Sequence, residues 1–433
     1  MNCDTRSEMD RKNAPDIEKV MELSVPSQQP FDHIHATPVY AVEDETENLV
    51  KIEFVFPAGS GEEHKQLLAT STSSMLMEGA GQYTSGQISE TKDYYGAKIQ
   101  TGVGKDVASV TLVCLKSNLE ELIPLVCAII QAPHFPEKEF ESYKRRTKAH
   151  LKVNLEKVEI SCRLVFSELF FGESKYAERY DPEDFDKIEI ADLKAFHQNN
   201  YRLKDAQVYM SGASIQTAIS LLKENLKADE SALETKALSG FGPHPQKKFI
   251  RKEGALQSAI RVGFPAISRH HEDYPAFYLT NTILGGYFGS RLMQNIREDK
   301  GYTYGIGSSI NHLKDLTYVV ISTQVGAAHT EATLTELNRE VDRLRSEAVS
   351  SEELDLVKNY TAGALLRSFD GTFSQASLLN NMLVHGLSES YYAEFLEKIY
   401  AVAATDITRI AQIYFDPKKF TIAVVGEGFS DND

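Results

Sequence analysis

The sequence predicts an α+β fold of two homologous domains, each a mostly antiparallel sheet packed with helices. Three observations support this prediction: a weak internal repeat, alternating strand patterns in both halves, and long helix patterns at matching places in each half. The chain has 433 residues, which exceeds one ordinary hydrophobic core and suits two or three domains.

The internal repeat relates the second half of the chain to the first. Glu139 and Lys144 match Glu353 and Lys358 at one constant spacing, and this spacing also relates the two residues Asp192 and Asp406. Earlier in each half, the segment 56–58 and the segment 264–266 both read Phe-Pro-Ala. A solenoid repeat has a period of about 20–50 residues, so this much longer repeat indicates two domains.

Strands and helices can be placed within each half. Alternating apolar patterns predict strands at 49–59, 108–116 and 206–212, and again at 258–266, 317–325 and 420–428. Long helix patterns run over 137–157 and 352–367, and an apolar helix follows the first strand of each half at 66–79 and 277–286. We expect an N-terminal extension at 1–34, domains at 35–226 and 249–433, and a polar linker rich in Gly and Pro at 227–248.

Composition excludes some classes of function. The net charge of −16 argues against binding to a nucleic-acid backbone, which requires clustered Lys and Arg. None of the four cysteines forms a C-x-x-C pair, and Cys114, Cys127 and Cys162 stand in apolar runs, so we expect buried free thiols there. The sequence shows neither a signal-like apolar region near its start nor an apolar run of about 18 residues. We expect a cytoplasmic protein without membrane contact, or a periplasmic one if a signal sequence was removed.

The repeat, the strand ending in "FPAGS" and the apolar helix that follows it resemble the pitrilysin/insulinase family of zinc peptidases. The length and layout are most similar to the branch of the mitochondrial processing peptidase, and the resemblance covers the chain from about residue 35. It implies that the two domains form half of a clamshell. In this family the first helix carries H-x-x-E-H, whose two His share a helix face and bind Zn²⁺ while the Glu activates water.

The matching helix of this chain has lost these groups. The two His positions fall at Thr70 and Ser74, and the Glu position falls at Ser73. Neutral hydroxyls are poor zinc ligands and poor general bases. The third ligand of the family is expected within 150–156, where Glu156 is the nearest carboxylate, and one carboxylate does not hold zinc. We therefore expect no zinc in this chain.

Two other histidine groups could be considered as replacements for the lost motif. His64 follows two Glu residues, and His270 and His271 precede Glu272 and Asp273. No H-x-x-x-H spacing occurs in the sequence. We expect both groups in surface loops.

The second half retains a different set of groups. "NIREDKGYTYGIGSS" contains Arg297 and, seven residues later, Tyr304, which match the Arg and Tyr that the non-metal domain of the family contributes. The resemblance implies that both side chains hold peptide carbonyls and stabilise the oxyanion of a tetrahedral intermediate. The structural alternative is that Arg297 pairs with Glu298 or Asp299 on a surface helix end and that Tyr304 is a half-buried strand residue.

The stretch "LGGYFGSRL" precedes this pair. Gly285, Gly286 and Gly289 resemble the glycine-containing segment of the family and would let a substrate peptide approach the backbone. The alternative is that these glycines end one helix and begin the next through positive φ angles.

Together these features predict the non-metal-binding subunit of a heterodimeric zinc metallopeptidase. Its partner would be a homologous subunit with an intact H-x-x-E-H motif that holds the zinc, and the pair would hydrolyse peptides. The alternative from another functional class is a non-catalytic peptide-binding or scaffolding homodimer.

Overall fold

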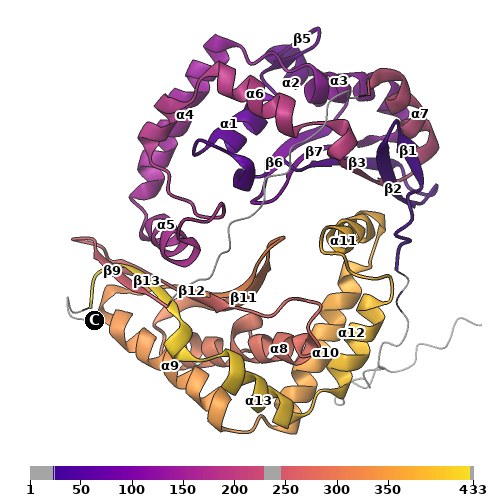
Figure 1. The fold of residues 1–433 in the computed structure, drawn as a ribbon. Coiled ribbons are helices and arrows are strands. Elements are labelled where there is room, and N and C mark those ends of the chain that lie inside the picture. The colour runs from indigo at the N-terminus through magenta and orange to yellow at the C-terminus, as the bar shows by residue number, and fades with distance from the viewer. Residues whose placement is uncertain (1–22, 24, 229–244, 430–433) are drawn as a thin grey trace, which may run out of the picture.

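The computed structural model describes residues 23, 25–228 and 245–429. This part of the chain forms two halves, each with one large sheet, and the two sheets face one another across the middle of the molecule (Figure 1). The predicted α+β fold is confirmed. Most of the predicted linker lies outside the described residues.

The first half contains a six-stranded sheet in the order β1-β2-β8-β3-β7-β6. Its strands are β1 (Asp32–Ile34), β2 (Thr37–Glu43), β3 (Leu49–Phe56), β6 (Lys98–Val103), β7 (Ala108–Leu115) and β8 (Gln207–Gly212), with a small separate hairpin of β4 (Gly79–Ala80) and β5 (Tyr83–Thr84). Strand β1 falls within the expected N-terminal extension and pairs with β2. The pair β2–β8 is parallel, whereas the other pairs of this sheet are antiparallel.

The second half contains a five-stranded sheet in the order β11-β12-β10-β13-β9. Its strands are β9 (Lys247–Arg251), β10 (Gln257–Pro265), β11 (Thr303–His312), β12 (Thr317–Gly326) and β13 (Thr421–Gly426). The pair β13–β9 is parallel and the others are antiparallel. The two sheets therefore repeat each other, with β3 and β10 in corresponding places.

All described helices other than α5 and α11 lie away from the space between the two sheets (Figure 1). The first half has α1 (Leu68–Met75), α2 (Ser85–Tyr94), α3 (Leu119–Gln131), α4 (Glu137–Leu155), α5 (Val158–Phe171), α6 (Ile190–Asn200) and α7 (Ile215–Asn225). The second half has α8 (Tyr274–Asn281), α9 (Thr330–Ser346), α10 (Ser351–Ser368), α11 (Thr372–Val384), α12 (Tyr391–Ala401) and α13 (Ala404–Tyr414). No helix among these described residues is long and apolar enough to span a bilayer.

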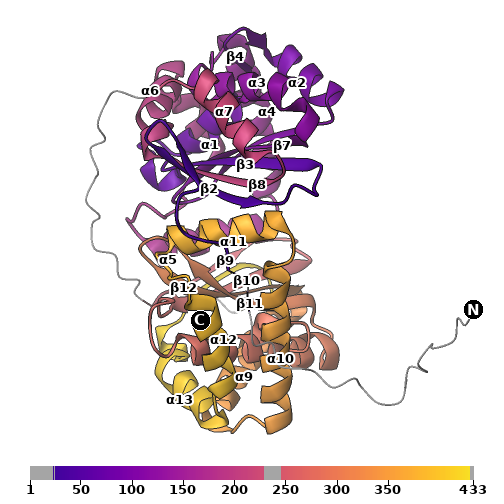
Figure 2. The same cartoon turned by 90° about the vertical axis from the view of Figure 1, so that its right-hand side faces the viewer.

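Two helices lie between the sheets, and each packs on the sheet of the other half (Figures 1 and 2). Helix α5 belongs to the first half by sequence, but its Phe166 and Phe170 join an apolar cluster with Tyr318 and Ala423 of the second sheet. Helix α11 packs on β2 and β8, where Leu379 contacts the cluster of the first sheet. This exchange joins the halves through two buried apolar contacts.

The repeated residues have the same local roles in both halves. The Asp192 carboxylate accepts a hydrogen bond from the backbone N–H of Glu189 at 2.8 Å, and the Asp406 carboxylate accepts one from Ala403 at 2.9 Å. Each bond satisfies one of the backbone N–H groups left without an intrahelical partner at the start of α6 or α13. The repeat therefore reflects a shared helix start as well as a shared strand order.

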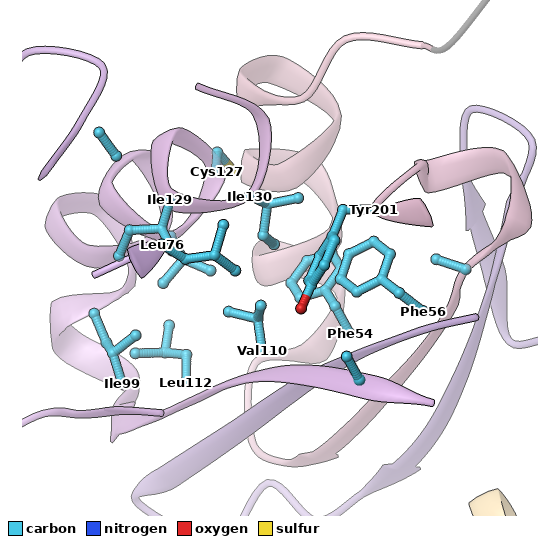
Figure 3. Close-up of a cluster of buried hydrophobic side chains, with 14 of the residues drawn as sticks. Phe54, Phe56, Leu76, Ile99, Val110, Leu112, Cys127, Ile129, Ile130 and Tyr201 are labelled. Atoms are coloured by element: carbon cyan, nitrogen blue, oxygen red, sulfur yellow. The ribbon is translucent and has the colours of Figure 1, made fainter. Parts of the chain in front are cut away.

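The core of the first half fixes helix α1 against the sheet. Leu76, just after α1, lies in one apolar cluster with Ile130 of α3 and Val110 of β7 (Figure 3). Tyr201 closes this cluster, with its ring centroid 5.1 Å from that of Phe56. The position of α1 thus depends on burial of apolar side chains and not on metal ligands.

The expectation for the cysteines is confirmed for three of them. Cys114, Cys127 and Cys162 are buried free thiols, whereas Cys3 lies outside the described residues. Burial raises the pKa of each of the three thiols to about 12.

Candidate functional site

Helix α1 carries the three positions of the lost metal motif. Thr70 is exposed, Ser74 is half-buried and Ser73 is buried. Thr70 and Ser74 are separated by four residues and share a helix face, as two ligands would. Their side chains are one hydroxyl each, so this face offers no imidazole and no carboxylate.

Glu156 does not complete the site. It follows the last residue of α4, its side chain is 79% exposed, and it accepts a hydrogen bond from Lys252 Nζ at 3.0 Å. In the described part of the chain, no group of three or more His, Cys, Asp or Glu side chains is placed to hold a metal ion. The residues present at α1 and α4 therefore do not fit a catalytic zinc.

The two histidine groups considered as replacements lie at the surface, as expected. His64 is exposed, with Nε2 3.8 Å from a carboxylate oxygen of Asp192. His270 and His271 are exposed too, and their ring nitrogens contact backbone groups of His385 and Asp273. Neither group converges on α1.

A carboxylate that the sequence analysis passed over lies at the start of α1. Glu63 accepts hydrogen bonds from the backbone N–H groups of Leu67 at 3.1 Å and Ala69 at 2.9 Å. Burial raises the pKa of Glu63 to about 7, and these N–H groups together with Lys105 partly oppose the rise. Glu63 thus caps α1, the helix that holds the metal-motif positions. The one sequence signal for this role was its place just before a helix that lacks a Ser, Thr, Asp or Asn cap.

Arg297 lies in a π-helical segment, Met293–Asp299. Its guanidinium carbon lies 4.6 Å from the ring centroid of Phe288, a cation–π contact, and its Nε lies 3.4 Å from a Glu298 carboxylate oxygen. Phe288 is 66% exposed, so the stacked pair stands at the surface. Sequence reasoning missed Phe288, although a large aromatic residue between glycines was visible in "GGYFGS".

Tyr304 stands at the start of β11, an edge strand of the second sheet. It is 93% exposed, so the alternative of a half-buried strand residue is wrong. With Arg261 and Glu159 it lines a pocket of about 430 Å³ on the face of the sheet that α5 also covers. Within the described residues no hydrogen bond or ring contact joins Tyr304 to Arg297, so the two side chains stand as separate surface groups.

The three glycines differ in their surroundings. Gly285 is buried, and a Cβ atom there would lie 2.7 Å from Cβ of Ser308 in β11, so this position allows close packing of the two segments. Gly286 is exposed and Gly289 is partly exposed. None of the three has a positive φ, so the alternative based on positive φ angles is wrong. Access for a peptide backbone stays a prediction, and it can apply only to the two accessible positions.

Comparison with known proteins shows a similarity to one peptidase family. Residues 187–361 match the peptidase M16 inactive domain, and this stretch includes Gly285, Arg297 and Tyr304. Residues 187–361 are thus similar to the M16 peptidase family. The resemblance to pitrilysin/insulinase-type zinc peptidases is thereby confirmed, and the matched stretch runs from the end of the first half into the second half.

Individual proteins are similar to this chain over different shares of its length. The "non-peptidase homolog YmxG" of Helicobacter pylori is 20% identical over 385 residues, which cover 86% of this chain and 88% of that protein. The "uncharacterized zinc protease YmxG" of Bacillus subtilis is 29% identical over 131 residues, and this match spans only 30% of this chain and 32% of the relative. The crystal structure of a peptidase M16 inactive domain from Pseudomonas fluorescens has the same fold, with a TM-score of 0.81, 24% identity, and coverage of 94% of this chain and 99% of that one.

Proposed function

We propose that this chain is the non-metal-binding subunit of a heterodimeric zinc metallopeptidase that hydrolyses peptides. The observation that carries the proposal is the contrast between its halves. Thr70, Ser73 and Ser74 occupy the metal-motif positions of α1, while Arg297 and Tyr304 are retained in the second half. The zinc would belong to a homologous partner with an intact H-x-x-E-H motif.

The surface around Tyr304 suits a role in another subunit's site. A phenol that is 93% exposed and a Phe288 ring that is 66% exposed make few contacts within their own chain. A phenol O–H and a guanidinium can donate to the carbonyl oxygen of a bound peptide and to the negative oxygen that forms when that carbonyl is attacked. These are the contributions that a chain without its own metal ligands can make.

The names of two relatives point in the same direction. One relative is called a non-peptidase homolog, and another, the YmfF protein of Bacillus subtilis, is called a probable inactive metalloprotease. These names support a chain that does not catalyse by itself. They leave the partner and the peptide to experiment.

The experiment uses a reconstituted pair of this chain and a zinc-motif homologue from the same genome. Tyr304→Phe should lower kcat/KM by about 10²-fold, the order seen when one oxyanion donor is removed. Arg297→Ala should lower it by a similar factor. The matched control is Tyr94→Phe, because Tyr94 is also highly exposed but lies on α2 in the other half. Unchanged turnover in both site variants would contradict the proposal.

One observation favours the alternative of a non-catalytic, scaffolding homodimer. Arg297 already has a carboxylate neighbour, Glu298, and an aromatic neighbour, Phe288, which together give it a structural role without any substrate. Under this alternative the exposed Phe288 and Tyr304 would be covered by a second copy of the chain. A stable homodimer that resists exchange with the zinc-motif homologue would support it.

A further inference from the structure

Arg261 of β10 is a cation that makes no ion pair within 4 Å among the described residues. It lines the same pocket as Tyr304, on the sheet face that looks toward the first half. Among the residues that the structure describes, none forms a hydrogen bond or ion pair with its guanidinium, although the residue is only partly exposed. A half-buried charge without a partner is costly, and such side chains gather at binding sites.

The first half has a charged residue at the position equivalent to Arg261, and that residue forms an ion pair. The Phe-Pro-Ala match aligns β3 with β10. In this alignment Glu53 is equivalent to Arg261, and Lys51 is equivalent to Ala259. Lys51 and Glu53 form an ion pair of 2.8 Å. In the second half the residue equivalent to Lys51 is Ala259, which carries no charge and cannot form this ion pair with Arg261. The repeat thus supplies an internal comparison for the unpaired guanidinium.

Two other charged groups near Arg261 already have hydrogen-bond partners. The Glu159 carboxylate, which also lines the pocket, accepts a hydrogen bond from the Gln324 side-chain amide at 2.7 Å. Arg163 pairs with Glu178 and donates a hydrogen bond to Tyr180 at 2.9 Å. Burial lowers the pKa of the Arg261 guanidinium, as does Arg163, while Cys162 and Glu159 oppose this shift. In the pocket of about 430 Å³, an incoming carboxylate would therefore meet a guanidinium that has no hydrogen-bond partner among the described residues, with the Glu159 carboxylate beside it.

We propose that Arg261 is a specificity-determining residue that binds a carboxylate of the peptide held at Tyr304. The planar guanidinium can take a carboxylate through two parallel hydrogen bonds. Thr303 and Ser322 line the same pocket and provide hydroxyl groups beside it. This inference rests on the proposed function, and it adds that the bound peptide is acidic at one position or ends at the pocket.

The test measures peptide binding to the full chain alone, by fluorescence anisotropy at low salt. Four labelled decapeptides of one Ala/Gln/Tyr sequence are compared: amidated, with a free C-terminal carboxylate, amidated with one internal Glu, and amidated with Gln in place of that Glu. The wild-type chain should bind at least one carboxylate peptide about ten-fold more tightly than its neutral match. Preference for the free C-terminus identifies an end carboxylate, and preference for Glu identifies a side chain.

The variants decide whether Arg261 is responsible. Arg261→Gln should remove the carboxylate preference and leave binding of the neutral peptides unchanged, and Arg261→Lys, which retains charge without the planar fork, should keep part of it. Arg339→Gln makes the same charge change on exposed α9 and should change nothing. If Arg261→Gln does not fold, the partial loss in Arg261→Lys carries the test.

The possible results separate this inference from the proposed function. The inference alone would be overturned if neutral peptides bound as tightly as their carboxylate matches. It would also be overturned if both Arg261 variants kept the preference for carboxylate peptides. Failure of all four peptides to bind would overturn it together with peptide binding by this chain.

Discussion

The Phe166 ring of α5 lies directly on the backbone of Gly263 in β10. A Cβ atom at residue 263 would lie 2.4 Å from Cζ of this ring. Phe166 belongs to the first half by sequence and Gly263 to the second, so this contact is part of the exchange that holds the two sheets together. The relative position of the halves, and with it the pocket beside Tyr304, depends on such contacts.

Gly263→Ala should therefore lower the free energy of unfolding by about 1–3 kcal/mol, because the ring must move out of a packed interface to admit a methyl group. Chemical denaturation monitored by circular dichroism measures the change. The control is Gly86→Ala, since no atom lies within 4 Å of a Cβ at that exposed position of α2. This control should be neutral or slightly stabilising. A Gly263→Ala chain as stable as wild type would show that α5 does not press on β10.

The cysteines give a prediction about reactivity. Burial raises the pKa of Cys114, Cys127 and Cys162 to about 12, so little thiolate is present at pH 8 and little of it is accessible. In a Cys3→Ser chain, no thiol should react promptly with a disulfide reagent in the native state. All three should react in denaturant. A prompt native reaction would contradict the burial described above.

His312 predicts a dependence of stability on pH. Burial and the nearby Arg269 lower its pKa from about 6.5 to about 3, while Tyr274 Oη lies 3.0 Å from its Nε2. The folded state therefore disfavours the protonated ring. The contribution of His312 to the free energy of unfolding is fully present above pH 6.5. It is lost as the pH falls toward 3, and the loss at pH 5 is about 2 kcal/mol.

His312→Gln should flatten this part of the curve of unfolding free energy against pH. The difference between the wild-type and variant curves isolates the histidine from other titrating groups. His64→Gln, which changes an exposed histidine, serves as the control. Parallel curves for wild type and His312→Gln between pH 7 and pH 5 would refute the assignment.

Restoring the motif should not restore a metal centre. In the triple variant Thr70→His, Ser73→Glu and Ser74→His, two imidazoles share one helix face, but the carboxylate nearest the expected third position, Glu156, is 79% exposed and bound to Lys252. Two ligands without a third bind zinc weakly. After dialysis, elemental analysis should find far less than one zinc per chain, both in this variant and in wild type. One tightly held zinc per variant chain would show that a third ligand is available.

Much of the fold could be predicted from the sequence because its signals are local. Alternating strands and the helix patterns at 137–157 and 352–367 depend on periodicity, and the structure has α4 and α10 there. The repeated Asp192 and Asp406 signalled matching helix starts. The loss of the metal motif could be read directly, since it depends on residue type at fixed spacing.

The exchange of α5 and α11 could not be predicted, because both helices look like ordinary members of their own half. The burial of Gly285 and the capping by Glu63 depend on which segments meet in space. Arg261 escaped notice for the same reason. That it lacks the close ion pair of the equivalent Glu53 becomes visible only when β3 and β10 are compared and the pocket at Tyr304 is known.

The measurement that tests the central claim most directly is peptidase activity in three samples: this chain alone, its zinc-motif homologue alone, and the equimolar mixture. Our account predicts activity in the mixture far above the sum of the separate chains, with loss of that activity when the mixture contains Tyr304→Phe. Inactivity of all three samples, with this chain forming a stable dimer by itself, would contradict the split site and favour a scaffold.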